Sequence, residues 1–294
     1  LSGLPEPLTR AVVWNALRDA VRDGELAVPA YLEAACTHLP HETDLAVVQG
    51  VLAFATAHAA DRYLTAEKRP AALASLTALC RDLIRRTEDG DNPGLRLIAV
   101  RHFIDVASQP DTIAAWLADG TVPGGPELDP ELRWRVLARL AALGATDEAA
   151  IAAELGRDPS ATGQEGAARC RAAQPDPQAK SRAWEAMFAT DAVTDLSTSL
   201  FTATAQGFWQ PEQADLVHPY VARYFQDAVA VAARRGPAIA DAAGRWAFPV
   251  HAVDTETLRL GETCLADSDP IPSLRRKLSD QLDDLARALR VRQA

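Results

Sequence analysis

The sequence has few cysteines, no long apolar run and no strand-like alternation. Its four cysteines show no Cys-x-x-Cys spacing, which argues against a clipped metal or a redox pair. No stretch approaches the roughly 20 consecutive apolar residues of a membrane-spanning helix, and the first ten residues do not resemble a signal peptide. We therefore expect a soluble cytoplasmic protein without a membrane partner. Its free and buried thiols are expected at Cys36, Cys80, Cys170 and Cys264.

Positive charge is also scarce. Lysine and arginine total 30 against 40 aspartates and glutamates, giving a formal net charge of -10. Such an acidic chain has little to attract a phosphate backbone, so nucleic acid is not an expected partner. A hydrophobic content of 48% can fill a sizeable core without disulfides or metals.

Recognisable catalytic motifs are missing as well. There is no Gly-x-Ser-x-Gly elbow, no phosphate-binding loop and no dinucleotide fingerprint. His41-Glu42 begins like a zinc-protease helix, but such a helix needs its second histidine where Leu45 stands. His38 and His41 form an H-x-x-H pair interrupted by Pro40, which we interpret as loop or interface histidines, with a ligand pair as the alternative.

Three aspartates, Asp280, Asp283 and Asp284, share one face of the last predicted helix. Helical enzymes that bind magnesium place aspartates in this way, but no second aspartate-rich motif accompanies them. Basic residues surround them: Arg275, Arg276, Lys277 and Arg287. We interpret the face as solvated and paired, and keep a magnesium-dependent all-α enzyme as an alternative. We assign no catalytic, cofactor-binding or metal-binding residue.

Apolar residues recur at helical spacing through almost the whole chain, which predicts an all-α fold. The predicted helix 273–290 has Ser273 as its N-cap and a stripe of apolar residues along one face. A second predicted helix, which ends before Gly90, carries a similar stripe. The stripe of the first helix comprises Leu274, Leu278, Leu282, Leu285 and Leu289. The stripe of the second comprises Leu73, Leu76, Cys80 and Leu83.

Start and stop signals divide the chain into about fourteen or fifteen helices of roughly 10 to 20 residues. Asp129-Pro130 and Asp176-Pro177 open two of them, Gly144 closes one, and Thr146 caps the next. Helix pairs are predicted at 93–107 with 111–119 and at 129–143 with 146–155.

Pairs of this kind resemble the units of about 40 residues in HEAT and armadillo arrays. The sequence therefore predicts a superhelical array of antiparallel helix pairs. Residues 120–126 and 266–272 are expected to be loops, and neither is long enough to tether separate domains. We expect a single domain over 1–294.

The C-terminal third is rich in aromatic residues, namely Trp209, Tyr220, Tyr224, Phe225, Trp246 and Phe248. Tyr220 and Tyr224 lie one helical turn apart, which favours core packing. The alternative is a concave surface that contacts peptides. Its cations would be Arg223, Arg234, Arg235 and Arg245.

Three stretches together resemble a known domain. Residues 4–26 read LPEPLTRAVVWNALRDAVRDGEL, and residues 244–249 read GRWAFP. The most specific stretch, 133–184, combines an Arg-Trp helix, an Asp-x-x-x-Thr-Gly turn at 158–163 and an alanine-rich helix that leads to Trp184. Together they resemble the C-terminal helical domain of bacterial aminopeptidase N, especially the actinobacterial form, which is similar to that of the endoplasmic-reticulum aminopeptidases.

The resemblance implies a non-catalytic domain of a zinc aminopeptidase that removes N-terminal amino acids from peptides. In that family the catalytic domain carries an H-E-x-x-H-type zinc site and a Gly-Ala-Met-Glu-Asn stretch, and this sequence has neither. Both, with the zinc, are expected upstream of Leu1, since the chain starts with leucine and its only methionine is Met187. The implied role is to cap the catalytic cleft and form part of the peptide chamber, so the implied partners are the catalytic domain and peptide substrates. A stand-alone helical scaffold that binds a protein or peptide is the alternative.

Overall fold

The computed structural model describes residues 1–88, 90, 92–188 and 195–294. Within these ranges the chain forms helices and no strand, with one isolated bridge between Thr121 and Glu127. The predicted all-α class is confirmed. The described residues divide into two compact units, Leu1–Leu132 with Arg287–Ala294, and Arg133–Ala286. That residues 1–294 form one domain stays a prediction.

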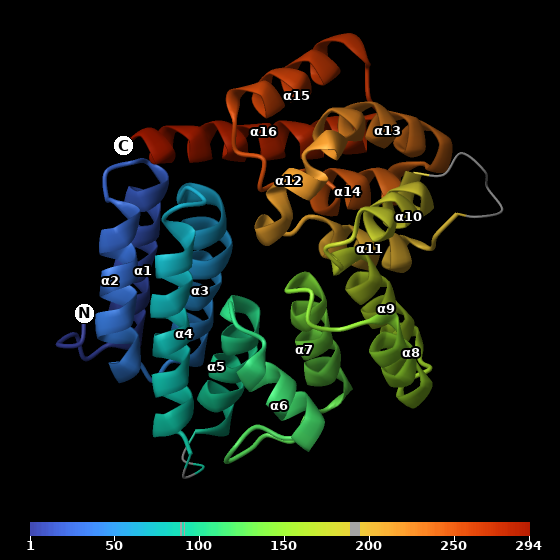
Figure 1. Ribbon diagram of the computed structural model, residues 1–294. Coiled ribbons are helices and arrows are strands. Elements are labelled where there is room, and N and C mark those ends of the chain that lie inside the picture. The colour runs from blue at the N-terminus through green and yellow to red at the C-terminus, as the bar shows by residue number, and fades with distance from the viewer. Residues whose placement is uncertain (89, 91, 189–194) are drawn as a thin grey trace. The chain divides into compact units, whose positions relative to one another are not determined.

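The first unit is a stack of neighbouring helices (Figure 1). They are α1 (Pro7–Arg22), α2 (Val28–His38), α3 (Leu45–Phe54), α4 (Arg69–Arg86), α5 (Pro93–Val106) and α6 (Asp111–Asp119). Helix α4 packs against α5 and α2, and α3 packs against α1 and α5. The predicted stripe of α4 is buried in this stack, as its spacing indicated: Leu73, Leu76, Cys80 and Leu83.

A chain of aromatic rings connects the first three helices. The ring centroids of Trp14 on α1 and Tyr31 on α2 are 5.9 Å apart, and those of Tyr31 and Phe54 are 5.1 Å apart. Phe54 ends α3, and the chain continues directly as a π-helix, η2 (Ala55–Tyr63). Edge-to-face contacts of this kind add to the burial of the rings and fix their orientation. Trp14 is therefore held in place by α2.

The second unit contains further pairs of adjacent helices (Figure 1). They are α8 (Glu148–Arg157), α9 (Ala161–Ala173), α10 (Pro177–Phe188), α11 (Thr198–Phe208), α12 (Ala214–Val217), α13 (Pro219–Arg235), α14 (Pro237–Trp246) and α15 (Thr255–Asp267). Helix α9 packs closely along α11, and α13 packs along α14. Helices α7 (Pro130–Ala142) and α16 (Pro272–Gln293) each contribute residues to both units.

Both predicted helix pairs form in the structure. The rings of Phe103 on α5 and Trp116 on α6 lie 4.9 Å apart. In the second unit, Arg133 of α7 donates two hydrogen bonds to Glu154 of α8, each 2.7 Å long. The α-solenoid character predicted from the sequence is confirmed in these stacked pairs. The loop at 120–126 is also confirmed, and Gly120 ends α6 with a φ of 72°.

Two predicted N-caps are wrong, Thr146 by one residue and Ser273 by two. The Asp147 carboxylate, and not Thr146, accepts the backbone N–H of Ala150 at the start of α8. Helix α16 begins at Pro272, so Ser273 already lies inside the helix. The reason is the preference of proline for the first helical position, where no amide hydrogen is needed. The other two openings are confirmed, since Asp129 and Asp176 accept amide hydrogens from α7 and α10.

The described residues form sixteen α-helices, and the difference from the predicted fourteen or fifteen includes the four-residue α12. The apolar stripe of α16 is buried at four of its five predicted positions, with Leu289 half-buried. Among the helices described, none is both long enough and apolar enough to cross a bilayer.

Candidate functional site

The described residues do not provide a metal site. No group of three or more histidine, cysteine, aspartate or glutamate side chains among them is placed to hold an ion. A zinc ion needs at least three protein ligands at about 2.0–2.3 Å. The side chains of the described part of this chain therefore do not fit a zinc centre, and we derive no chemistry from one here.

The histidine pair lies at a helix end. His38 is the last residue of α2, and His41 lies in the 3-10 turn η1 (Leu39–His41). The Nδ1 atom of His38 is 2.7 Å from the Ser2 hydroxyl. Glu42 is buried and accepts hydrogen bonds of 2.8 Å from both Nε and Nη2 of Arg10. This arrangement favours the loop interpretation over a ligand pair.

Glu42 is held as a carboxylate. The hydrogen bonds from Arg10 lower its pKa, and the backbone amides of Asp44 and Thr43 add to this effect. A charged, fully engaged carboxylate at the end of α2 ties α1 to the start of α3. The role of Glu42 is therefore to fix the positions of these helices.

The aspartate cluster of α16 is surrounded by other pairs. Lys277 lies 3.3 Å from Asp241, and Arg275 lies 3.1 Å from Asp269, so two of the surrounding cations pair elsewhere. Asp280 is exposed. Among the described residues, these aspartates do not belong to a group of three or more side chains that could hold a metal ion. The arrangement favours a solvated helix face.

Core packing accounts for most of the aromatic third. Four of the six predicted residues are buried: Trp209, Tyr224, Phe225 and Phe248. Trp246 is 37% exposed, and the guanidinium of Arg245 lies 4.7 Å from its ring centroid. Arg223 stacks on two rings, and Arg234 and Arg235 pair with Asp195. A peptide-contacting concave surface stays a prediction.

All four cysteines are free thiols, as predicted. Cys80, Cys170 and Cys264 are buried, whereas Cys36 is only half-buried. Burial raises the pKa of each thiol, that of Cys170 to about 12. At neutral pH these groups are protonated and weakly nucleophilic.

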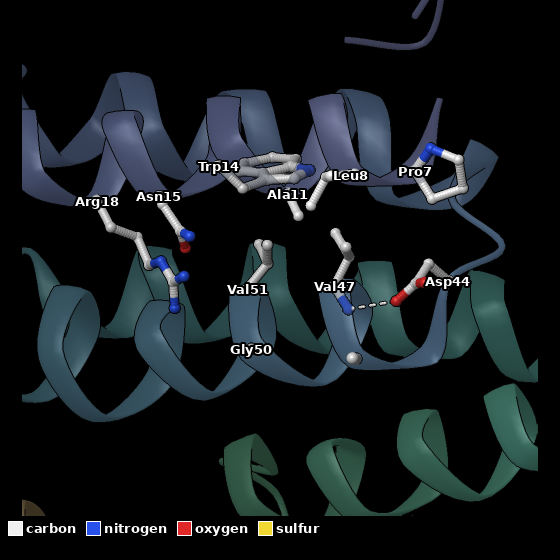
Figure 2. A pocket seen from close by; sticks show the side chains of 11 residues that line it. Pro7, Leu8, Ala11, Trp14, Asn15, Arg18, Asp44, Val47, Gly50 and Val51 are labelled. Carbon is white, nitrogen blue, oxygen red and sulfur yellow. Dashed lines mark hydrogen bonds between the residues drawn. The ribbon is translucent and has the colours of Figure 1, made fainter. Parts of the chain in front are cut away.

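The most distinctive surface lies between α1 and α3 in the first unit. A groove of about 360 Å³ lies between the two helices, and Figure 2 shows the side chains that line it. Trp14, Val47 and Val51 form its apolar floor, and all three are buried. The ring of Tyr31 packs against Trp14 in an edge-to-face contact and restricts its orientation.

Charged side chains lie at the two ends of this groove. Asp44 caps α3 by accepting the backbone N–H of Val47 at 3.0 Å, so its carboxylate is engaged. Arg18 reaches across from α1 towards Gly50 of α3 (Figure 2). Its guanidinium has no carboxylate within ion-pair distance among the residues that the structure describes. The groove thus combines an apolar floor with a cation that is available to a ligand.

Exposed apolar residues occur on α1 and at the start of α3, and one of them, Leu8, lines the groove. Leu8 is 77% exposed and Val12 is 58% exposed, although they are one helical turn apart on α1. Leu45, the first residue of α3, is 39% exposed. This surface was not predicted from the sequence. The signal was the pattern of α1, where Leu8 and Val12 lie off the face that buries Trp14 and Val21.

Two further grooves occur on the described surface. One of about 650 Å³ lies between α2 and α4, and its lining includes Leu32, Cys36 and Leu64. Another of about 270 Å³ lies in the second unit beside α9 and α10, where Glu148 pairs with Arg171 at 2.6 Å. The groove between α2 and α4 has Glu33, Glu67 and Lys68 in its lining, whereas the third groove has the paired Glu148 and Arg171.

Comparison with known proteins gives two findings. Residues 1–287 match the family described as ERAP1-like C-terminal domain. The chain is also similar to Aminopeptidase N of Streptomyces lividans, with 34% identity over 297 residues. That alignment covers 100% of this chain and 34% of the relative, so the chain spans about a third of the length of the curated relative it matches.

Proposed function

Because the chain belongs to the ERAP1-like C-terminal domain family, we propose that it is the non-catalytic C-terminal domain of a zinc aminopeptidase. The parent enzyme removes N-terminal amino acids from peptides. The observation that carries the proposal is the family match over residues 1–287, and the similarity to Aminopeptidase N over the whole chain supports it. In this proposal zinc binds in the parent's catalytic domain, and the parent acts in the cytoplasm.

The domain's role in the proposal is to cap the catalytic cleft and to form part of the chamber that holds the peptide. Stacked helix pairs suit this role because they present long continuous faces and can move as blocks. The stacked pairs α4–α5 and α9–α11 give the chain such faces. Its partners are the parent's catalytic domain and the peptide substrates.

The net charge of the chain favours neutral and basic peptide substrates over acidic ones. A formal net charge of -10 repels acidic peptides at long range, and the effect falls as salt rises. Neutral and basic peptides should therefore reach the chamber faster than acidic ones. The stand-alone scaffold is not favoured, because the matched family is a C-terminal domain and the relative is much longer than this chain.

An activity assay tests the proposal. The parent enzyme, encoded by the complete reading frame, should release amino acids from aminoacyl amides and short peptides, and a zinc chelator should abolish this release. The 294-residue chain alone should show no zinc-dependent turnover. Robust turnover by the chain alone, or a complete reading frame without a peptidase domain, would overturn the assignment.

The capping role needs its own measurement. The parent should trim short peptides much faster than the N-terminus of a folded protein that begins with the same residues, because a closed chamber excludes the folded protein. A parent enzyme lacking residues 1–294 should lose this discrimination if its catalytic domain remains folded, which circular dichroism checks. Equal trimming of peptide and folded protein by the intact parent would contradict the role.

A further inference from the structure

We infer that the groove between α1 and α3 binds a segment of the parent enzyme that precedes this domain. The inference rests on the proposed function, because it takes its occupant from the parent chain. To the proposed function, the inference adds the surface at which the two parts of the enzyme meet and the chemical character of the bound segment. The occupant carries apolar side chains for the floor and for Leu8, and one carboxylate for Arg18.

The exposure of apolar side chains on α1 and at the start of α3 is the first observation. Within the part of the chain that the structure describes, the exposed large apolar side chains are those of Leu8, Val12, Leu45 and Trp246. Three of these lie on α1 or at the start of α3, and Leu8 is the one among them that lines the groove. Each Å² of apolar surface left in water costs about 25 cal/mol, so a cluster of this kind favours coverage by another surface.

The floor of the groove is the second observation. Trp14 is 2% exposed and rigidly packed on Tyr31, so the groove exists before anything binds. A preformed site saves the entropy of ordering its own side chains when a ligand binds. The volume of about 360 Å³ accommodates a few apolar side chains but no folded domain, which points to a short segment.

The charge at the end of the groove is the third observation. Arg18 extends over Gly50 with no ion-pair partner among the described residues, and its guanidinium can bind a carboxylate through two parallel hydrogen bonds. Asp44 at the other end is already used in capping α3. An occupant with one acidic residue beside apolar residues therefore fits, whereas a basic segment meets Arg18 unfavourably.

The length of the relative identifies the occupant. The chain corresponds to 34% of Aminopeptidase N of Streptomyces lividans, and its family is named as a C-terminal domain. The rest of such an enzyme joins this domain at its N-terminal end, where α1 is the first helix. Arg10 of α1 donates hydrogen bonds to the carbonyls of Leu4 and Pro5, which holds the N-terminal residues beside the start of α1, where Pro7 and Leu8 line the groove. A segment that leads into Leu1 can thus reach the groove.

Amide hydrogen exchange on the parent enzyme tests the inference. Backbone amides of α1 and α3 should exchange at least about tenfold more slowly in the parent than in the 294-residue chain, because a bound segment suppresses local opening. Gly50→Leu should remove this protection in the parent, since a Cβ at Gly50 meets only Arg18 at 3.7 Å and the larger side chain fills the groove. Arg18→Gln should remove part of it, and Arg18→Lys should retain more.

Gly156→Leu is the matched control, because Gly156 is also a helical glycine and nothing lies within 4 Å of the position that a Cβ would take there. It should leave the exchange of α1 and α3 unchanged. Equal exchange of these helices in the chain and in an active parent would overturn the inference while the proposed function stands. Slower exchange in a parent without aminopeptidase activity would support the docking and overturn the proposed function. Protection that grows with the concentration of the 294-residue chain alone would identify a second copy as the occupant and overturn the inference.

Discussion

The ammonium group of Lys180 donates a 2.6 Å hydrogen bond to the backbone carbonyl of Ala172 inside the second unit. A second bond, 2.9 Å long, goes to the carbonyl of Phe208. These carbonyls lie at the C-terminal ends of α9 and α11, where helices leave acceptors unsatisfied and carry partial negative charge. Lys180 thus holds together the ends of two helices that also pack along each other.

The burial of Lys180 predicts a pH dependence of stability. Desolvation lowers its pKa to about 7 in the folded chain, against about 10.4 in the unfolded chain. Between these values the unfolded state binds more protons, so the free energy of unfolding should rise with pH from about 7 to about 10. The slope from this one group is at most about 1.4 kcal/mol per pH unit. Urea denaturation at several pH values measures it.

Lys180→Met is the variant that isolates this effect. It keeps the length and the apolar part of the side chain but removes the titrating group. The rise in the free energy of unfolding between about pH 7.5 and 9.5 should be smaller in the variant than in the wild-type chain. Identical pH profiles would show that Lys180 keeps an ordinary pKa in the folded chain.

Several helix ends were predictable from local sequence, and the role of Lys180 was not. Asp129-Pro130, Asp176-Pro177 and Gly144 mark helix ends through their own backbone preferences, so a single sequence identifies them. From the sequence alone, Lys180 on α10 would be predicted to be an ordinary surface lysine. Its burial depends on where α9 and α11 end in space, which no local pattern contains.

The exposed apolar residues of α1 were not predicted for the same reason, because local sequence does not show how helices pack. Trp14 was part of a recognisable stretch, but the exposure of Leu8 and Val12 depends on how α1 lies against α2 and α3. The absence of a zinc-protease motif, in contrast, could be recognised without knowing how the helices pack. His41-Glu42 lacks the second histidine at Leu45, and this could be read without coordinates.

A buried and an exposed ion pair in the same unit should differ in their effect on stability. Glu154 is buried and accepts two hydrogen bonds from Arg133 on α7. Glu154→Ala should lower the free energy of unfolding by about 3 kcal/mol, because it leaves a poorly hydrated guanidinium without its partner. Chemical denaturation with global fitting measures the change.

Glu256→Ala is the matched control, since Glu256 and Arg259 pair at 2.6 Å with most of both side chains in water. Its unfolding midpoint should not differ measurably from wild type, because exposed pairs gain little in high dielectric. A loss at Glu256 as large as that at Glu154 would contradict the assigned difference in burial.

The close packing of α9 on α11 predicts opposite effects of one substitution at two glycines. A Cβ at Gly207 would overlap the carbonyl oxygen of Arg169, so Gly207→Ala should push the helices apart and cost about 3 kcal/mol. Gly156→Ala, on the exposed side of α8, meets nothing and should stabilise by up to about 1 kcal/mol through helix propensity. Melting temperatures of the two variants should lie on opposite sides of wild type. Destabilisation by both would show that backbone strain, and not helix contact, governs these positions.

Thiol labelling tests the arrangement of the cysteines. In the native chain only Cys36 is partly accessible, and it lies in the groove between α2 and α4. We expect a disulfide reagent to label Cys36 alone, at a rate that rises with pH because burial raises the pKa of its thiol. Cys36→Ser should abolish native-state labelling, whereas denaturant should expose all four thiols of the wild-type chain. Rapid labelling of Cys80 or Cys170 without denaturant would mean that the helices covering them open far more readily than their close packing implies.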